Sequence, residues 1–251
     1  MSEIRKLTAE ADKSRDEALE ALFSNMPKSD DMSVELPSKG KFYKEFSEVV
    51  VSPLSFTDEE AILNTKGKGS NIINMLLEKS IKGVSVPDLI LMDKFYLLMK
   101  LREASYGDDY SFEIPCPHCD KTTRTEMKIS QNLNVRFIPD DLEDPRKVKL
   151  PKLGVDVEVR FPRVREESFL EDPITASRNL YRFVVSIDGN KDPVFISKAL
   201  DRMHIQDVKK IAKEVTMDHF GVDPRFLYEC QSCGETSLLQ IPLGADFFSV
   251  S

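Results

Sequence analysis

The residues best suited to chemistry in this sequence are its four cysteines, which fall into two pairs of the form CxxC. Cys116 and Cys119 lie in the stretch IPCPHCDKTT, and Cys230 and Cys233 lie in YECQSCGETS. Two residues between cysteines allow both thiolates of one turn to point at the same tetrahedral ion, and two such turns supply the ligands of a closed zinc site. The spacing therefore predicts a structural Zn²⁺ held by all four cysteines.

The expected compartment favours a metal over disulfides. The N-terminal stretch MSEIRKLTAEADKS lacks the uncharged core of a signal peptide, and no apolar run approaches the ~18 residues of a membrane helix. We therefore expect the protein in a cytoplasm, where thiols stay reduced. A thioredoxin-like dithiol is the main alternative, but it needs a single pair at a strand-to-helix junction. His118 lies inside the first turn, and we expect it to be an exposed spacer.

The segments that must position these turns alternate between apolar and polar residues. The alternation predicts hairpins over residues 110–130 and 225–243, which form the two halves of a zinc ribbon. More than a hundred residues separate the halves, so we expect the ribbon to clasp an inserted unit, residues 131–224. Within it, VKLPKLGVDVEVRFPRV (148–164) predicts a hairpin around Gly154, and residues 166–221 show helical periodicity.

The rest of the chain is expected to be mainly helical. Residues 1–34 form an amphipathic or flexible arm with a helix over 2–23, residues 35–109 form a helical domain, and residues 244–251 form a C-terminal tail. A helix expected to begin at Ser85 is apolar on nearly all sides, so more than one layer must cover it. The predicted fold class is α+β, a helical body with short β-hairpins and a split four-cysteine ribbon clasping an inserted helical unit.

Composition and motifs argue against catalysis and against broad binding to polyanions. The chain contains no HExxH, GxSxG, Walker or dinucleotide motif, and its three histidines form no i, i+4 pair. A closed four-thiolate site has no open position for a substrate. We therefore expect no enzyme activity. The net charge of −8 repels phosphate backbones and anionic lipid, so membrane binding is not expected and nucleic-acid binding is disfavoured.

Several segments, in their order along the chain, resemble the T4-type bacteriophage base plate protein family. They are ELPSKGKFY, VVVSPLSFTDEEAILN, the two CxxC turns, HFGVDPRFLYEC and IPLGADFF, and together they cover residues 35–248. The resemblance implies a role in the central hub of a phage tail baseplate, as a hub component or as an assembly factor that binds other hub proteins. It also implies a location in the host cytoplasm during tail assembly or in the virion baseplate.

The resemblance also implies a surface for hub partners in the LPSKGKFY and ADFF segments. The residues assigned to it are Leu36, Pro37, Gly40, Phe42, Tyr43, Phe247 and Phe248. A zinc-ribbon protein that binds nucleic acid is the alternative from another functional class. That alternative requires a basic strip formed by Lys121, Arg124, Lys128, Arg160, Arg163 and Arg165.

Overall fold

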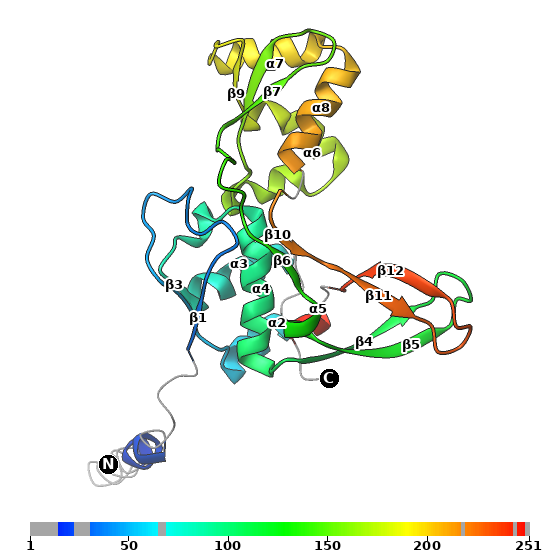
Figure 1. Ribbon diagram of the computed structural model, residues 1–251. Helices are drawn as coiled ribbons and strands as arrows, with labels where there is room; N and C mark the ends of the chain where they lie inside the picture. The colour runs from blue at the N-terminus through cyan, green and yellow to red at the C-terminus, as the bar shows by residue number, and fades with distance from the viewer. Residues whose placement is uncertain (1–14, 23–30, 65–68, 217–218, 243–244, 249–251) are drawn as a thin grey trace, which may run out of the picture.

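The computed structural model describes residues 15–22, 31–64, 69–216, 219–242 and 245–248. A body built on one central helix carries an insert at one end and a pair of hairpins at its side, with a short helix of the N-terminal region beyond the body (Figure 1). Helices and strands are mixed throughout, which confirms the expected combination of α and β structure. Within the described residues, no helix is both long enough and apolar enough to span a membrane.

Helix α4 (Leu91–Tyr106) is the centre of the body. Buried residues point from it in several directions, as its all-round apolar pattern predicts. The expected start at Ser85 is wrong: a 3-10 turn, η1 (Val86–Asp88), comes first. Ile90 is extended and pairs with Arg163 as an isolated β-bridge, so the helix begins only after it. Gly107, with φ of 84°, ends the helix and donates its N–H to the carbonyl of Glu103.

The remaining body elements cover α4. Helix α3 (Gly69–Ser80) contacts α4 directly, and so does β2 (Val49–Val51), the central strand of an antiparallel sheet with β1 (Met32–Val34) and β3 (Ile81–Lys82). Helix α2 (Phe56–Asn64) packs against the turn at residues 245–248. The main core includes Leu77, Leu97 and Leu101, and it continues without interruption into the cysteine-bearing hairpins, because Cys116 and Cys230 belong to the same cluster. The hairpins are therefore an extension of the body.

The insert has a hydrophobic core of its own, formed by residues between Val148 and Val215. Strands β7 (Arg146–Lys149) and β8 (Asp156–Val159) form the hairpin expected around Gly154. A third strand, β9 (Val184–Ile187), pairs with β8, although this segment was expected to be helical. The strand forms because Val184 and Ile187 are buried in the sheet. The helical elements around this sheet are η2 (Val164–Leu170), α6 (Pro173–Asn179), η3 (Leu180–Phe183), α7 (Pro193–Arg202) and α8 (Ile205–Thr216).

A narrow stem joins the insert to the body. Strands β6 (Asn134–Arg136) and β10 (Gly221–Asp223) pair antiparallel across it, and a third, small core of Ile90, Ile138, Phe161 and Phe220 fills the junction. The short helix α5 (Ile129–Asn132) leads into β6. In the N-terminal arm, residues 15–22 are helical with Leu19 and Leu22 exposed, and the rest of the helix expected over 2–23 lies outside the described residues.

Candidate metal centre

The four cysteines are carried by two hairpins that face each other. The first consists of β4 (Asp109–Pro115) and β5 (Thr122–Lys128), and the second of β11 (Arg225–Glu229) and β12 (Thr236–Gln240). Alternate side chains along each strand point inward, so Phe112 of the first hairpin meets Phe226 of the second at a centroid distance of 5.5 Å. Each hairpin turns at its CxxC pair, which places the two turns at the same end.

The first turn is shaped by backbone hydrogen bonds. The N–H of Cys116 donates to the carbonyl of Lys121 at 3.0 Å, and the N–H of Asp120 donates to the carbonyl of Cys116 at 2.9 Å. Asp120 has a φ of 57°, in the left-handed region that Asp tolerates. The N–H of His118 lies 3.4 Å from the sulfur of Cys116. Such N–H groups stabilise a thiolate in the turn.

The second turn repeats the first almost group for group. The N–H of Cys230 donates to the carbonyl of Glu235 at 3.0 Å, and the N–H of Gly234 donates to the carbonyl of Cys230 at 2.8 Å. Gly234 has a φ of 75°, and it occupies the position that Asp120 holds in the first turn. Both turns thus give their two sulfurs the same orientation, although only the second has the expected glycine.

The sulfur positions fit one tetrahedral ion. The sulfurs of Cys116 and Cys233 are 3.7 Å apart, those of Cys119 and Cys230 are 3.8 Å apart, and all four lie within 4.8 Å of one another. A tetrahedron with Zn–S bonds of ~2.3 Å has edges of ~3.8 Å. A disulfide needs sulfurs ~2.05 Å apart, and all four cysteines are free thiols. The structure therefore brings together every predicted ligand at a spacing that suits a metal ion.

The site favours negative charge on one of its sulfurs, that of Cys230. The backbone N–H of Cys233, with help from that of Ser232, lowers the pKa of Cys230 to about 6. The Glu235 N–H lowers the pKa of Cys233, but desolvation and hydrogen bonds to the other thiols together outweigh it and raise that pKa to about 12. Four thiols this close cannot all ionise by themselves, since like charges repel. A divalent cation would stabilise all four thiolates at once.

His118 is not directed at the sulfurs. Its Nε2 lies 3.0 Å from the hydroxyl oxygen of Ser237 on the opposite hairpin. Among the described residues, the group able to hold a metal consists of the four cysteines alone. The candidate donor set is therefore four cysteine sulfurs, which suits a structural ion.

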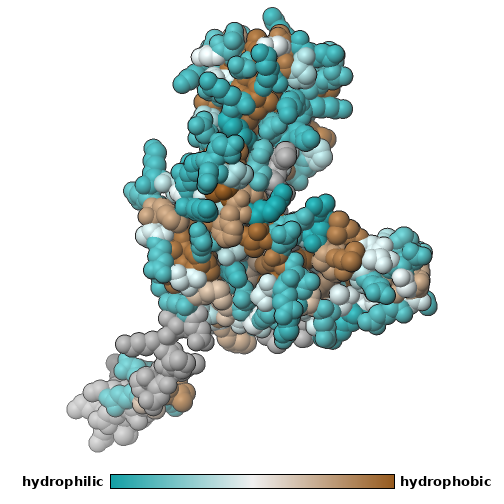
Figure 2. Space-filling model, in the orientation of Figure 1, coloured by the Kyte–Doolittle hydropathy of each residue, from teal (hydrophilic) through white to brown (hydrophobic). Residues whose placement is uncertain are grey.

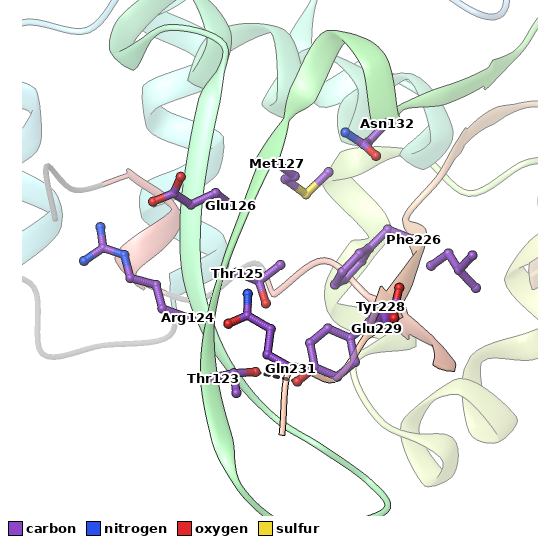
Figure 3. Close-up of a pocket in the computed structure, with 11 residues that line it drawn as sticks. Thr123, Arg124, Thr125, Glu126, Met127, Asn132, Phe226, Tyr228, Glu229 and Gln231 are labelled. Carbon is purple, nitrogen blue, oxygen red and sulfur yellow. Dashed lines mark hydrogen bonds between the residues drawn. The ribbon is translucent and has the colours of Figure 1, made fainter. Parts of the chain in front are cut away.

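The hairpins are held together beyond the sulfurs. The hydroxyl groups of Thr123 on β5 and Tyr228 on β11 hydrogen-bond directly across the space between them. Figure 3 shows the side chains of Thr125 and Met127 pointing toward those of Phe226 and Tyr228, while Arg124 and Glu126 point away from this space. Residues of β5 and β11 line a groove of ≈ 460 Å³ between these two strands.

The LPSKGKFY segment, expected to bind partners, packs mostly against other parts of the same chain. Leu36, Pro37 and Gly40 are buried, and Phe42 and Tyr43 are partly buried. Gly40 has a φ of 72°, and a side chain there would meet the ring of Phe46 at 2.4 Å. Aromatic residues and a glycine turn suit a segment that joins two parts of one chain as well as they suit a partner surface.

The same segment binds the stem and α4. The carbonyl of Pro37 accepts from the N–H of Ile138, and Nζ of Lys41 donates to the carbonyls of Asp140 and Leu142. The ring of Phe42 lies 5.7 Å from that of Phe161 at the junction. LPSKGKFY is thus the structural link between body and insert.

Asp93 anchors this link, and the sequence analysis did not identify it. Its carboxylate is fully buried, accepts the N–H of Ser38 at 3.0 Å and accepts the hydroxyl of Tyr43. Burial raises the pKa of Asp93 despite these hydrogen bonds, because the charged form loses its hydration. The sequence does contain a feature that could have identified Asp93, because it is the one acidic residue in the apolar run LILMDKFYLL. A buried carboxylate needs hydrogen-bond donors from elsewhere in the chain.

The ADFF segment is also a core element and not an exposed partner surface. Phe247 is 2% exposed and Phe248 is 4% exposed. The ring of Phe247 lies 5.2 Å from that of Tyr110 on β4, and the carbonyl of Phe248 accepts the hydroxyl of Tyr106 on α4 at 2.8 Å. The short 3-10 turn η4 (Ala245–Phe248) therefore closes the core where the hairpins leave the body.

Replacing Tyr43 by phenylalanine should destabilise the link. The hydroxyl donates to one oxygen of Asp93 and accepts the N–H of Ile90 at 3.1 Å, so its loss leaves that carboxylate oxygen and a buried N–H without a partner. We expect each of these two unpaired groups to lower the free energy of unfolding, measured with urea at pH 7, by ~1–3 kcal/mol. The penalty should shrink at acidic pH, because the folded-state pKa of Asp93 is raised and protonation removes the unpaired charge.

Tyr181→Phe is the matched control for this change. Among the described residues, the hydroxyl of Tyr181 makes no hydrogen bond, so its removal should alter the free energy of unfolding by less than ~0.5 kcal/mol. Equal effects of the two substitutions would contradict the anchoring role of Tyr43.

The basic strip required for nucleic-acid binding is not assembled. Arg160 forms a double hydrogen bond to Glu166 at 2.6 and 2.7 Å, and Arg163 pairs with Asp144 at 2.8 Å. Arg165 pairs with Asp88 at 2.5 Å, and Lys128 pairs with Asp109 at 3.0 Å. Lys121 and Arg124 belong to the first hairpin, away from the three arginines at the stem. The positive charges are therefore mostly neutralised within the chain.

Taken together, the fold and the site define a mixed α/β protein in which two hairpins of the body form a candidate four-cysteine metal centre, with a second core inserted between them. A family model described as T4 bacteriophage base plate protein matches residues 26–249, nearly the whole chain. The chain therefore belongs to the family of T4 bacteriophage base plate proteins, which confirms the resemblance seen in the sequence. Searches among curated proteins and among solved structures returned no match.

Proposed function

We propose that the protein acts in building the baseplate hub of a phage tail, as a hub component or as an assembly factor, by binding other hub proteins and without catalysis. The observation that carries this proposal is the family match over residues 26–249. In this proposal the protein meets its partners in the host cytoplasm during tail assembly.

The metal centre supports this function by fixing the hairpins. We propose that Zn²⁺ binds the sulfurs of Cys116, Cys119, Cys230 and Cys233, whose spacing matches a four-thiolate tetrahedron. Such an ion joins residues more than a hundred positions apart, so it holds the hairpins closed around the chain between them. All four ligand positions belong to the protein, and the role proposed for the ion is structural.

The proposal is tested in cells infected by a phage from which this chain has been deleted. We expect tail assembly to stop at baseplates without a central hub, and expression of the chain from a plasmid should restore complete tails. Electron microscopy and sedimentation of the lysates give the readout. Normal hubs in the absence of the chain would overturn the proposed function.

Mass spectrometry of purified particles beside the lysate separates the two forms of the proposal. A fixed copy number in particles identifies a hub component, whereas abundance in the lysate with absence from particles identifies an assembly factor. The recombinant protein should also contain one zinc per chain.

A further inference from the structure

Each cysteine-bearing hairpin is a two-stranded sheet, so both of its strands are edge strands, and the edges of β5 and β11 lie next to each other. The first hairpin is a two-stranded sheet of β4 and β5, and the second is a two-stranded sheet of β11 and β12. The edges of β5 and β11 run side by side along the groove of Figure 3. A strand edge carries backbone N–H and C=O groups that can pair with another strand. The groove therefore has two such edges on the same side of the molecule.

On β5, the unpaired backbone groups belong to Arg124 and Glu126. The hydrogen bond from Cys116 N–H to the Lys121 carbonyl fixes the alternation, so the odd-numbered residues of β5 bond to β4 and the even-numbered residues face outward. At the body end of the edge, the amide of Asn132 already donates to the carbonyl of Lys128 at 2.8 Å. In the described part of the chain, the backbone groups of Arg124 and Glu126 make no hydrogen bond.

On β11, the outward-facing backbone groups belong to Leu227 and Glu229. The bond from Cys230 N–H to the Glu235 carbonyl assigns the even-numbered residues to β12. The side chain of Leu227 is 74% exposed, and it lies opposite Leu238 on β12, which is 58% exposed. Figure 2 shows apolar side chains at the surface over these strands. This outer face is unusually apolar for exposed edge strands.

The edge of β5 is complementary in charge to itself. If a second copy paired with it antiparallel about Thr125, Arg124 of each copy would lie opposite Glu126 of the other. Both residues have outward-facing backbone groups, so this register also forms ladder hydrogen bonds. Opposite charges on directly facing residues stabilise an antiparallel pair, and the two-fold symmetry creates the contact twice.

The edge of β11 is also self-complementary. Antiparallel pairing about Leu227 places the two copies of this leucine against each other and sets Arg225 opposite Glu229 of the other copy. Arg225 already binds Asp223 through its guanidinium at 2.6 Å and through its N–H at 3.1 Å, so Glu229 would join an existing ion pair. The backbone bonds of Leu227 and Glu229 are therefore the main contribution at this edge.

One two-fold axis can serve both edges. The hydrogen bond between Thr123 and Tyr228 places the Cys end of β5 level with the Cys end of β11. Phe112, which pairs with Thr125 across the first hairpin, lies against Phe226, so the middles of the two strands are also level. These contacts place Thr125 level with Phe226, so a two-fold axis through Thr125 passes within one residue of Leu227.

We propose that two copies of this chain associate through these edges, so that β5 pairs with β5 and β11 pairs with β11 of the second copy. Each two-stranded hairpin would then form a four-stranded antiparallel sheet with the same hairpin of the second copy. Two observations favour a second copy of this chain as the partner. The order of charges along β5 is complementary to itself, and β5 and β11 lie at the same height in the molecule. This dimer goes beyond the proposed hub function. Its test uses the purified chain, so a negative result for the dimer leaves the hub function unaffected, and the reverse is also true.

Sedimentation equilibrium of the zinc-loaded, full-length chain tests the dimer. We expect a dimer for the wild type and about tenfold weaker association for Arg124→Glu, which sets two carboxylates against each other twice. The double variant Arg124→Glu, Glu126→Arg reverses both charges and should restore wild-type association. A wild-type chain that stays monomeric, or a double variant no tighter than the single one, would overturn the proposal.

A backbone substitution tests the strand pairing itself. Leu227→Pro removes an N–H that points away from β12, so the hairpin ladder is kept while the interface loses two symmetric hydrogen bonds. We expect association at least about tenfold weaker than for Leu227→Ala, which retains the N–H. Zinc content and circular dichroism verify that the proline variant is folded. Equal association of these two folded variants would also overturn the proposal, as would binding of an extended peptide from another protein to a monomeric wild type.

Discussion

Cys230→Ser is expected to release the metal and to produce the largest loss of stability among single substitutions in the hairpins. Cys230 is 1% exposed and its sulfur lies 3.8 Å from that of Cys119, so a shorter and less acidic hydroxyl cannot replace it at the same distance from the ion. Structural zinc contributes roughly 10–16 kcal/mol of apparent binding free energy in small metal-folded domains. Losing even a quarter of this should lower the melting temperature by about 6–12 °C.

The measurement combines metal analysis with differential scanning calorimetry. Wild-type protein treated with a strong chelator should reproduce the melting temperature of Cys230→Ser, because both lack the ion. Zinc affinity should fall as the pH is lowered, since every thiol must lose its proton to bind.

His118→Ala is the matched control for the cysteine substitution. The imidazole contacts Ser237 and not the sulfurs, so this variant should keep one zinc per chain and change the melting temperature only slightly. Full zinc content in Cys230→Ser, or zinc loss in His118→Ala, would contradict the four-cysteine centre.

Phe161→Ala is expected to weaken the junction between body and insert. The ring is fully buried, lies 5.6 Å from Phe220 and 5.7 Å from Phe42, and carries the guanidinium of Arg146 at 3.9 Å from its centroid. Deleting such a ring typically costs ~3–5 kcal/mol, because the cavity collapses only in part. The expected fall in melting temperature is about 6–20 °C.

The effect should be confined to the junction. The insert keeps its own core, so helix content should change little, whereas small-angle X-ray scattering should show a broader distribution of dimensions as the two parts separate. Phe56→Ala serves as the control, because that ring is 74% exposed and its loss should cost less than ~0.5 kcal/mol. Similar costs for the two substitutions would contradict the central role of Phe161.

The sequence identified the candidate metal ligands because the chemistry that favours them is local. A CxxC turn needs only a few neighbouring residues to orient two thiols, and two such turns offer few alternatives to one shared ion. Alternation over five to seven residues was likewise enough to predict the hairpins that carry Cys116 and Cys230. The helix expected after Ser85 was recognised from its apolar residues, but its start depended on the bridge between Ile90 and Arg163, a contact between residues far apart in sequence.

The partner surface could not be assigned from sequence, because an exposed aromatic residue and a buried one have the same letter. Phe42 and Phe247 were expected at an interface with other proteins, yet their partners are Phe161 and Tyr110 of the same chain. Strand β9 was missed for a related reason, since the segment around Val184 becomes a strand only beside β8.

By itself, the sequence determined the four thiols, the hairpins around them and the family to which the chain belongs. Only the tertiary structure decided that the sulfurs converge, that Asp93 anchors LPSKGKFY and that β5 and β11 leave their edges free. The physical reason is the range of the interactions. Turns and alternation depend on neighbouring residues, whereas burial and pairing depend on which distant segments the folded chain brings together.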